Sequence, residues 1–346
     1  MRIDYPPPLV QASRIAVTAP SSGVQAPLHR RLDLVIDHLK SQGFAVEEGR
    51  CLREQRQGAS ASADERAADL MRFLFRDDIA AIIPPWGGEL AIEVLDRLDW
   101  AALRNTRPKW LLGYSDTSTL LLALTLGLGW ATAHGPCLMD LAPGQDDPLT
   151  RPALAALATP RGATFNQRQS SAWQNRWTDF ADVPSTTYAL TEPTRWFALN
   201  GAHEVTVAGR LIGGCIDTLM HTAGTDHGDV RGFIERCGTQ GVLLYLENAE
   251  QSPVALVRAL HRLRWAGWLD GLAGLLIGRS AASDATAPGE LRYLDALRST
   301  LVSVACPVLV DVDIGHHPPQ LLLMNGARAV VHWSEVLGGA IEQRLE

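Results

Sequence analysis

The sequence contains few cysteines and no excess of basic residues. Its 5 cysteines are scattered over 346 residues without a C-x-x-C pair, a pattern typical of reduced structural thiols rather than of a disulfide framework. Lys and Arg number 31 against 38 Asp and Glu, so the net charge of −7 argues against binding to a phosphate backbone. We therefore expect a protein of a reducing compartment that has no nucleic-acid partner.

Segments that would enter or cross a membrane are also lacking. The N-terminal stretch MRIDYPPPLV has an aspartate and three prolines where a signal peptide needs an apolar core. The longest apolar run, residues 120–133, is interrupted by glycine and is too short for a bilayer. These features predict a cytoplasmic protein without a membrane partner.

Several catalytic signatures are absent as well. No G-x-x-x-x-G-K-[ST] motif is present, which excludes phosphoryl transfer by a P-loop, and no H-E-x-x-H motif points to zinc. The glycines at 127 and 129 lack the third glycine of a dinucleotide-binding turn. The sequence around Ser115 is GYSDT, which argues against the G-x-S-x-G turn of α/β-hydrolases. We expect neither a metal ion nor a cofactor.

Short apolar runs alternate with segments of helical period through the first half of the chain. Because these runs have no polar face, they are typical of parallel strands that are covered on both sides. The predicted strands are residues 15–20, 44–49, 78–88, 108–116 and 130–136, and the predicted helices are residues 28–43, 63–75, 89–100 and 117–127. This alternation predicts an N-terminal α/β domain with a parallel sheet over residues 1–170.

The composition changes after residue 144. Residues 144–200 combine clustered polar residues, prolines and three tryptophans without a sustained period, so we place a connecting segment at residues 171–200. Beyond it, strands are predicted at 203–214, 241–250, 271–280, 307–315 and 320–333, and helices at 252–267 and 290–304. Residues 201–346 are therefore predicted to form a C-terminal mixed α/β domain that is richer in strands.

Three of the predicted strand ends, at residues 21–23, 86–88 and 113–116, are candidates for a site, because ligands bind at the carboxyl ends of strands in an open parallel sheet. Ser115 stands between a strand and a helix, where its hydroxyl could act as a nucleophile near the positive end of the helix. Alternatively, Ser115 only caps the helix. Gly87 and Gly88 would let backbone N–H groups approach a carbonyl oxygen.

A serine nucleophile needs a base and a group that orients this base. Among the ten histidines, His134, His316 and His317 follow predicted strands. The last two lie between a glycine and two prolines, and a rigid turn of this kind after a buried strand easily fixes a base. Glu247 ends an apolar run and is the candidate for a buried, paired acid, with a solvated strand end as the alternative.

Together, these motifs resemble those of the serine LD-carboxypeptidase family, which includes muramoyltetrapeptide carboxypeptidases and microcin C self-immunity peptidases. The resemblance extends over nearly the whole chain through IAVTAPSSG, PPWGGEL, LLGYSDTSTLLLAL, HGP, GRLIGGCIDTL, LLYLEN, GLLIGRS and DIGHHPP. It implies a flavodoxin-like N-terminal α/β domain, a strand-rich C-terminal domain and a Ser-Glu-His triad in the cleft between them. It also implies a homodimer.

By motif, the resemblance assigns the triad to Ser115, Glu247 and His316. The oxyanion donors fall on the backbone of Gly88, with Gly87 as the alternative, and of Asp116. The residue that follows the base is more often Thr or Ser in the family, so His317 is not the expected base.

Two departures from the family pattern concern the substrate. Murein-trimming enzymes commonly have R-G-G where this chain has W-G-G at 86–88, and the usual G-G-N is G-G-C at 213–215. The tryptophan-bearing segment resembles the loop with which self-immunity peptidases stack an adenine-like ring, although its tryptophans could instead pack the domain interface. We expect substrate contacts from Trp86, Gly87, Glu89, Trp173 and Trp177.

These features favour cleavage of an amide bond in a small peptide-like substrate, an aminoacyl or peptidyl nucleotide, as in microcin immunity. One alternative is an LD-carboxypeptidase that trims the terminal D-Ala from murein tetrapeptides. The alternative from another class is a non-catalytic protein that binds a small ligand.

Overall fold

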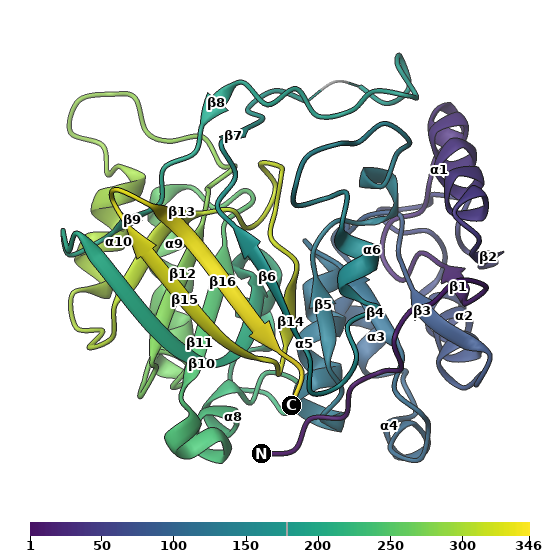
Figure 1. The fold of residues 1–346 in the computed structure, drawn as a ribbon, viewed down its shortest axis with the longest axis horizontal. Helices are drawn as coiled ribbons and strands as arrows, with labels where there is room; N and C mark the ends of the chain where they lie inside the picture. Colours follow the sequence, from purple (N-terminus) through teal and green to yellow (C-terminus); the bar gives the residue numbers. More distant parts are fainter. Residues whose placement is uncertain (178) are drawn as a thin grey trace.

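The computed structural model describes residues 1–177 and 179–346, and two sheets account for most of its strands (Figure 1). The first sheet has the order β14-β5-β4-β3-β1-β2, in which only β14 runs antiparallel to its neighbour. Its strands are β1 (Arg14–Val17), β2 (Ala45–Glu48), β3 (Ile79–Ile82), β4 (Trp110–Gly113), β5 (Thr132–His134) and β14 (Leu323–Asn325). The predicted parallel sheet of the first half is thereby confirmed.

The second sheet is longer and mixed, with the order β6-β16-β15-β10-β11-β12-β13-β9. Its four central strands are parallel, and the outer pairs are antiparallel. The strands are β6 (Thr164–Arg168), β9 (Phe197–Ala198), β10 (Glu204–Cys215), β11 (Val242–Glu247), β12 (Gly274–Gly278), β13 (Val308–Val312), β15 (Arg328–Ser334) and β16 (Gly338–Arg344). A separate small hairpin pairs β7 (Ala172–Trp173) with β8 (Glu192–Pro193).

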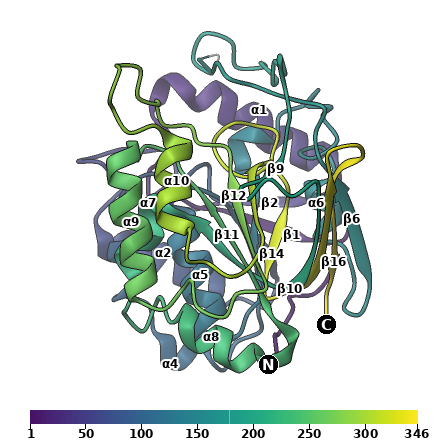
Figure 2. The same cartoon turned by 90° about the vertical axis from the view of Figure 1, so that its left-hand side faces the viewer.

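The helices cover the faces of these sheets, and α7, α9 and α10 lie together on one side of the second sheet (Figure 2). They are α1 (His29–Ser41), α2 (Ala63–Leu74), α3 (Ile92–Leu95), α4 (Trp100–Leu103), α5 (Thr117–Leu128), α6 (Ala153–Ala156), α7 (Ile216–Thr222), α8 (Val230–Cys237), α9 (Pro253–Trp265) and α10 (Tyr293–Leu301), with 3-10 turns at Ala26–Leu28, Leu138–Asp140 and Gly238–Gln240. In the described part of the chain, no helix combines the length and the hydropathy that a membrane span needs.

Two predicted elements are divided in the structure. The helix expected at residues 89–100 is replaced by α3 and α4, because the Asp99 carboxylate accepts a hydrogen bond from the Ala102 N–H at 2.9 Å and begins a new helix. The strand expected at residues 320–333 is divided into β14 and β15 by a turn at Gly326. There φ is +87°, and a Cβ atom would lie 2.8 Å from the Ile3 side chain.

Sheet membership does not follow chain order at two strands. β14 belongs to the C-terminal half, yet it pairs with β5 and completes the first sheet. Conversely, β6 precedes the connecting segment, yet it pairs with β16 at the edge of the second sheet. Each half of the chain therefore contributes one strand to the sheet built mainly by the other half.

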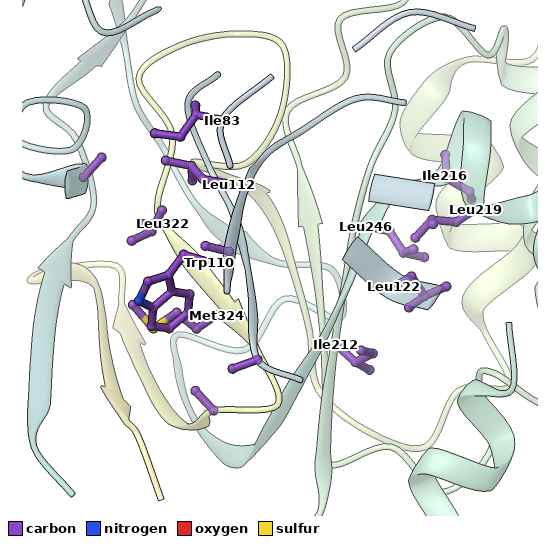
Figure 3. Packing of buried hydrophobic residues seen from close by; sticks show 14 of the residues in the cluster. Ile83, Trp110, Leu112, Leu122, Ile212, Ile216, Leu219, Leu246, Leu322 and Met324 are labelled. Carbon is purple, nitrogen blue, oxygen red and sulfur yellow. The ribbon is translucent and has the colours of Figure 1, made fainter. Parts of the chain in front are cut away.

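Helix α5 joins the two halves of the core. Residues 117–125 of this helix are all buried, as expected for a helix that is apolar on every side. Leu122 of α5 belongs to the same cluster as Ile216 and Leu219 of α7 and Leu246 of β11, which Figure 3 shows close to one another. Because α5 begins directly after the Ser115 turn, this packing positions that turn between the two sheets.

Candidate active site

Ser115 lies on a tight turn between β4 and α5. Its φ is +59°, which an L-residue adopts at a cost of about 1–2 kcal/mol. The N-cap position of α5 is Asp116, so Ser115 is not the cap of this helix. Strained turns of this kind cluster at functional sites, where they hold a side chain in a fixed direction.

The loop with Gly87 and Gly88 passes directly over this turn. A Cβ atom on Gly87 would lie 2.6 Å from the Ser115 Cβ and 2.8 Å from the Asp116 nitrogen, so only glycine fits there. Gly88 has a φ of +139°, and its Cβ would lie 2.5 Å from the Ser21 hydroxyl. The carbonyl of Gly87 accepts a hydrogen bond from the Ser22 N–H at 3.1 Å. The backbone of this loop is thus held against the serine turn.

The Asp116 carboxylate binds the segments on either side of the Gly87–Gly88 loop through hydrogen bonds. It accepts hydrogen bonds from the Ser21 hydroxyl at 2.5 Å and from the Ala91 N–H at 2.7 Å. Burial raises the pKa of this carboxyl above its ordinary value, and the hydrogen bond from Ser21 acts against that rise. Asp116 therefore connects the end of β1, the glycine loop and the start of α5.

Glu247 ends strand β11 of the second sheet, and it meets His316, which lies on the loop after β13. The imidazole Nδ1 of His316 donates to Glu247 Oε2 at 2.9 Å, and the Glu247 side chain is 0% exposed. Gly315 has a φ of +102°, and a Cβ there would lie 2.5 Å from Glu247 Oε2. The carboxylate is therefore buried and paired rather than solvated.

Pairing controls the ionisation of both groups. Burial would by itself raise the pKa of Glu247, but the facing His316 imidazole more than offsets this and holds the pKa below its ordinary value. Burial likewise acts to lower the pKa of His316, and the charge and hydrogen bond of Glu247 raise it above its ordinary value. The pair thus favours an imidazole that readily accepts a proton.

The other two candidate histidines occupy different environments. His134 is fully buried, which lowers its pKa to about 4, and neither ring nitrogen has a hydrogen-bond partner among the residues that the structure describes. His317 donates from Nδ1 to the Gln174 carbonyl at 3.2 Å, and its ring centroid lies 4.7 Å from that of Trp173. Only His316 of the three lines the same cavity as Ser115.

This cavity has a volume of about 430 Å³ and brings together residues from both halves of the chain. Its lining includes Ser115, His316, Tyr114, Trp86, Gly87 and Gly88, and also Ser22, Gln25 and Gln55. The Tyr114 and His316 rings meet edge to face at a centroid distance of 5.0 Å. The two glutamines were missed by the sequence analysis, because isolated glutamines in predicted loops carry no recognisable signal.

The remaining predicted contact residues lie outside the lining of this cavity. Glu89 is exposed to solvent, and partial desolvation of its carboxyl together with the charge of Glu250 raises its pKa. Trp173 lines a neighbouring cavity of about 340 Å³ together with Arg279 and His317. Trp177 is 46% exposed, with Tyr188 at a centroid distance of 6.3 Å.

Comparison with known proteins places this geometry in context. Residues 15–135 match the family model described as the LD-carboxypeptidase N-terminal domain, and residues 208–331 match that of the LD-carboxypeptidase C-terminal domain. A carboxypeptidase homologue from Streptomyces coelicolor is 30% identical over 327 residues, which cover 94% of this chain and 92% of the relative. The microcin C7 self-immunity protein MccF of Escherichia coli is 23% identical over 344 residues, which cover 98% of this chain and 96% of MccF.

Solved structures share the fold. MccF superposes with a TM-score of 0.81 at 21% identity and covers 98% of both chains. The muramoyltetrapeptide carboxypeptidase from Oxalobacter formigenes gives a TM-score of 0.71 at 21% identity and covers 96% of this chain and 98% of its own. The two-sheet fold and the family matches define a serine peptidase of the carboxypeptidase type. The chain belongs to the LD-carboxypeptidase family, as the resemblance predicted.

Proposed function

We propose that this protein hydrolyses an amide bond in a small peptide-like substrate through a triad of Ser115, Glu247 and His316. The observation that carries the proposal is the 2.9 Å bond from His316 to the buried Glu247, on an imidazole that lines the same cavity as Ser115. A hydroxyl, an imidazole and an orienting carboxylate are the groups that nucleophilic acyl transfer requires.

In the proposed mechanism, His316 takes the proton of Ser115 through Nε2 while the serine oxygen attacks the amide carbonyl. The Glu247 carboxylate accepts the Nδ1–H bond, which selects the tautomer with a free Nε2 and stabilises the imidazolium. Backbone N–H groups of Gly88 and Asp116 stabilise the oxyanion, a contribution of about 3 kcal/mol per donor. The imidazolium then protonates the leaving amine, and water hydrolyses the ester to release the acid.

For the substrate, we propose an aminoacyl or peptidyl nucleotide. Structures of MccF hold glutamyl sulfamoyl guanosine and aspartyl sulfamoyl adenosine. Trp86 lines the cavity, and Trp173 and Trp177 lie on the segment that could stack a base. The second candidate substrate is a murein tetrapeptide that would lose its terminal D-Ala, which the family and the Oxalobacter formigenes relative support.

The test begins with a serine-directed fluorophosphonate. We expect stoichiometric labelling of the wild-type chain at Ser115 and none in Ser115→Ala, with Ser118→Ala as the matched control that keeps labelling. An aminoacyl sulfamoyl adenosine and an L,D-linked tetrapeptide are then assayed in parallel. Removal of a triad nucleophile costs about 10⁶-fold in kcat, so hydrolysis that survives Ser115→Ala would exclude the proposal. A folded wild-type chain that resists labelling would favour the non-catalytic ligand-binding protein.

We also propose that the protein is a cytoplasmic homodimer. Light scattering of the purified chain tests the dimer directly, and a monomer at all concentrations would contradict it.

A further inference from the structure

The loop that carries His316 contains neither helix nor strand, and its own sequence limits how it can be held. Residues 318 and 319 are both proline, so neither has an N–H group to donate. The loop can therefore be fixed near the histidine mainly through its carbonyl groups. All three carbonyls that follow His316 are in fact engaged, those of His317, Pro318 and Pro319.

Arg279 supplies two of these three contacts. Its Nη2 donates to the His317 carbonyl at 2.9 Å and to the Pro319 carbonyl at 3.0 Å. The Pro318 carbonyl between them accepts from the Gln174 N–H at 2.8 Å. The planar, rigid fork of a guanidinium suits this task, because it presents several donors in fixed directions at once.

The guanidinium is itself fixed by a buried ion pair. Arg279 Nη1 lies 2.7 Å from Asp313 Oδ1, and the two side chains are 5% and 0% exposed. Asp313 also accepts hydrogen bonds from the Ser170 N–H at 3.0 Å and from the Trp196 indole at 2.9 Å. Its backbone carbonyl accepts from the Leu321 N–H at 2.7 Å, which closes the loop around the arginine.

From this arrangement we infer that Arg279 is the positioning residue of His316. It lies outside the cavity lined by Ser115 and touches no reacting atom, so it acts by fixing the loop that holds the imidazole against Glu247, in the cavity that Ser115 also lines. This inference rests on the proposed function only for its kinetic consequence. The structural consequence, a fixed His316–Glu247 pair, can be measured without turnover.

The first experiment compares Arg279→Lys with Arg210→Lys. Arg279→Lys keeps a positive charge opposite Asp313, but one ammonium cannot occupy both the Nη1 position against Asp313 and the Nη2 position that donates to the two carbonyls. Arg210 is a matched control, because it is equally buried and also donates to two backbone carbonyls, those of Gly326 and Glu346. It pairs with Val242 at the start of β11, whereas Glu247 lies at the end of that strand. Arg279→Gln with Asp313→Asn is the second variant, which removes the clamp without leaving a buried charge unpaired.

The readout is the titration of the His316 imidazole by NMR, assigned with His316→Gln. The carboxylates that act on this ring are Glu247, Asp217 and Asp140, and the titratable neighbours are His134 and His317; none of them is substituted. Because the Glu247 carboxylate raises the pKa of His316, a loosened pair should lower that pKa in Arg279→Lys and leave it unchanged in Arg210→Lys. Turnover per fluorophosphonate-titrated site should fall by about 10²-fold in the double variant, with KM changed far less.

Three outcomes decide the inference. A folded Arg279→Lys protein with the wild-type His316 titration and turnover overturns it. An equal shift in Arg210→Lys also overturns it, because the effect would then come from general loss of stability. If the wild-type protein neither hydrolyses substrate nor reacts with fluorophosphonate, but the His316 titration still depends on Arg279, the positioning role stands and only the proposed function fails.

Discussion

Replacement of Glu247 by glutamine tests the central pair of the site most directly. The amide has the shape of the carboxylate, and its carbonyl oxygen can still accept from His316 Nδ1 at the 2.9 Å position. Oε1 of Glu247 has no hydrogen-bond partner within residues 1–177 and 179–346, so the new NH₂ group replaces an unpaired atom there. The substitution therefore removes the charge and leaves the geometry.

We expect a large loss of activity with retention of the fold. An uncharged partner cannot stabilise the imidazolium, and the corresponding loss in a serine triad is about 10⁴-fold in kcat, or about 5 kcal/mol of transition-state free energy. Folding tolerates the change because His316 can remain neutral above its pKa. The thermal unfolding midpoint at pH 8 should therefore stay close to that of the wild-type protein.

The pH dependence gives an independent check of the same pair. The base must be neutral, so the labelling rate with fluorophosphonate rises with pH through the pKa of His316. Glu247 raises this pKa above its ordinary value in the native protein, whereas burial lowers it once the carboxylate is gone. The acid limb should therefore move to lower pH in Glu247→Gln.

The control is Glu250→Gln, three positions along on an exposed turn. It should keep both the rate and the acid limb of the wild-type protein. A Glu247→Gln protein with wild-type kcat, or with an unshifted acid limb, would refute the assignment of Glu247 as the orienting acid.

Two glycine substitutions probe the backbone around the site. Gly315→Ala places a Cβ 2.5 Å from Glu247 Oε2 at a φ of +102°, so it should lower both the unfolding midpoint and the labelling rate. The control is Gly289→Ala, which has a φ of +85° and open space around its Cβ, and which should show only the backbone cost of about 1–2 kcal/mol. Gly87→Ala should reduce kcat by at least about 10²-fold, because its Cβ would displace the Ser115 turn. The control Gly127→Ala should remain active, because its Cβ would lie at an ordinary contact distance of 3.5 Å from Trp100. Wild-type labelling of either site variant would contradict the close contacts that the structure describes.

The candidate site was more predictable than the arrangement of the strands. Ser115 is recognisable in the sequence because it lies between an apolar strand and an apolar helix, where a short turn must connect them. The structure places it at that turn. Glu247 is recognisable because it ends a strand of apolar residues, where a carboxylate is expected to be buried and therefore paired. The choice of His316 over His134, in contrast, depends on the resemblance, since His134 ends a buried strand and His316 follows one. Only the packing leaves His134 without a hydrogen-bond partner among the described residues.

What the sequence could not predict depends on contacts between distant residues. The sequence predicts β14 and β15 as one strand, and only the pairing of β14 with β5 shows that it belongs to the first sheet. The break between α3 and α4 depends on one Asp99 side chain, which competes with the helix through a local hydrogen bond. Arg279 lies in a motif that was recognised, but its role depends on carbonyls about forty residues away in the chain.

The chain crosses from one sheet to the other at the loop that carries His316, and this crossing constrains how the candidate site can move. His316 lies between β13 of the second sheet and β14 of the first, and β14 pairs with β5, next to the strand that leads to Ser115. A hinge that opened the two halves would have to break the β5–β14 hydrogen bonds and separate α5 from α7 in the shared core. The paired strands and the shared core therefore link the Ser115 turn to the His316 loop, so relative motion of the two sheets would disrupt both.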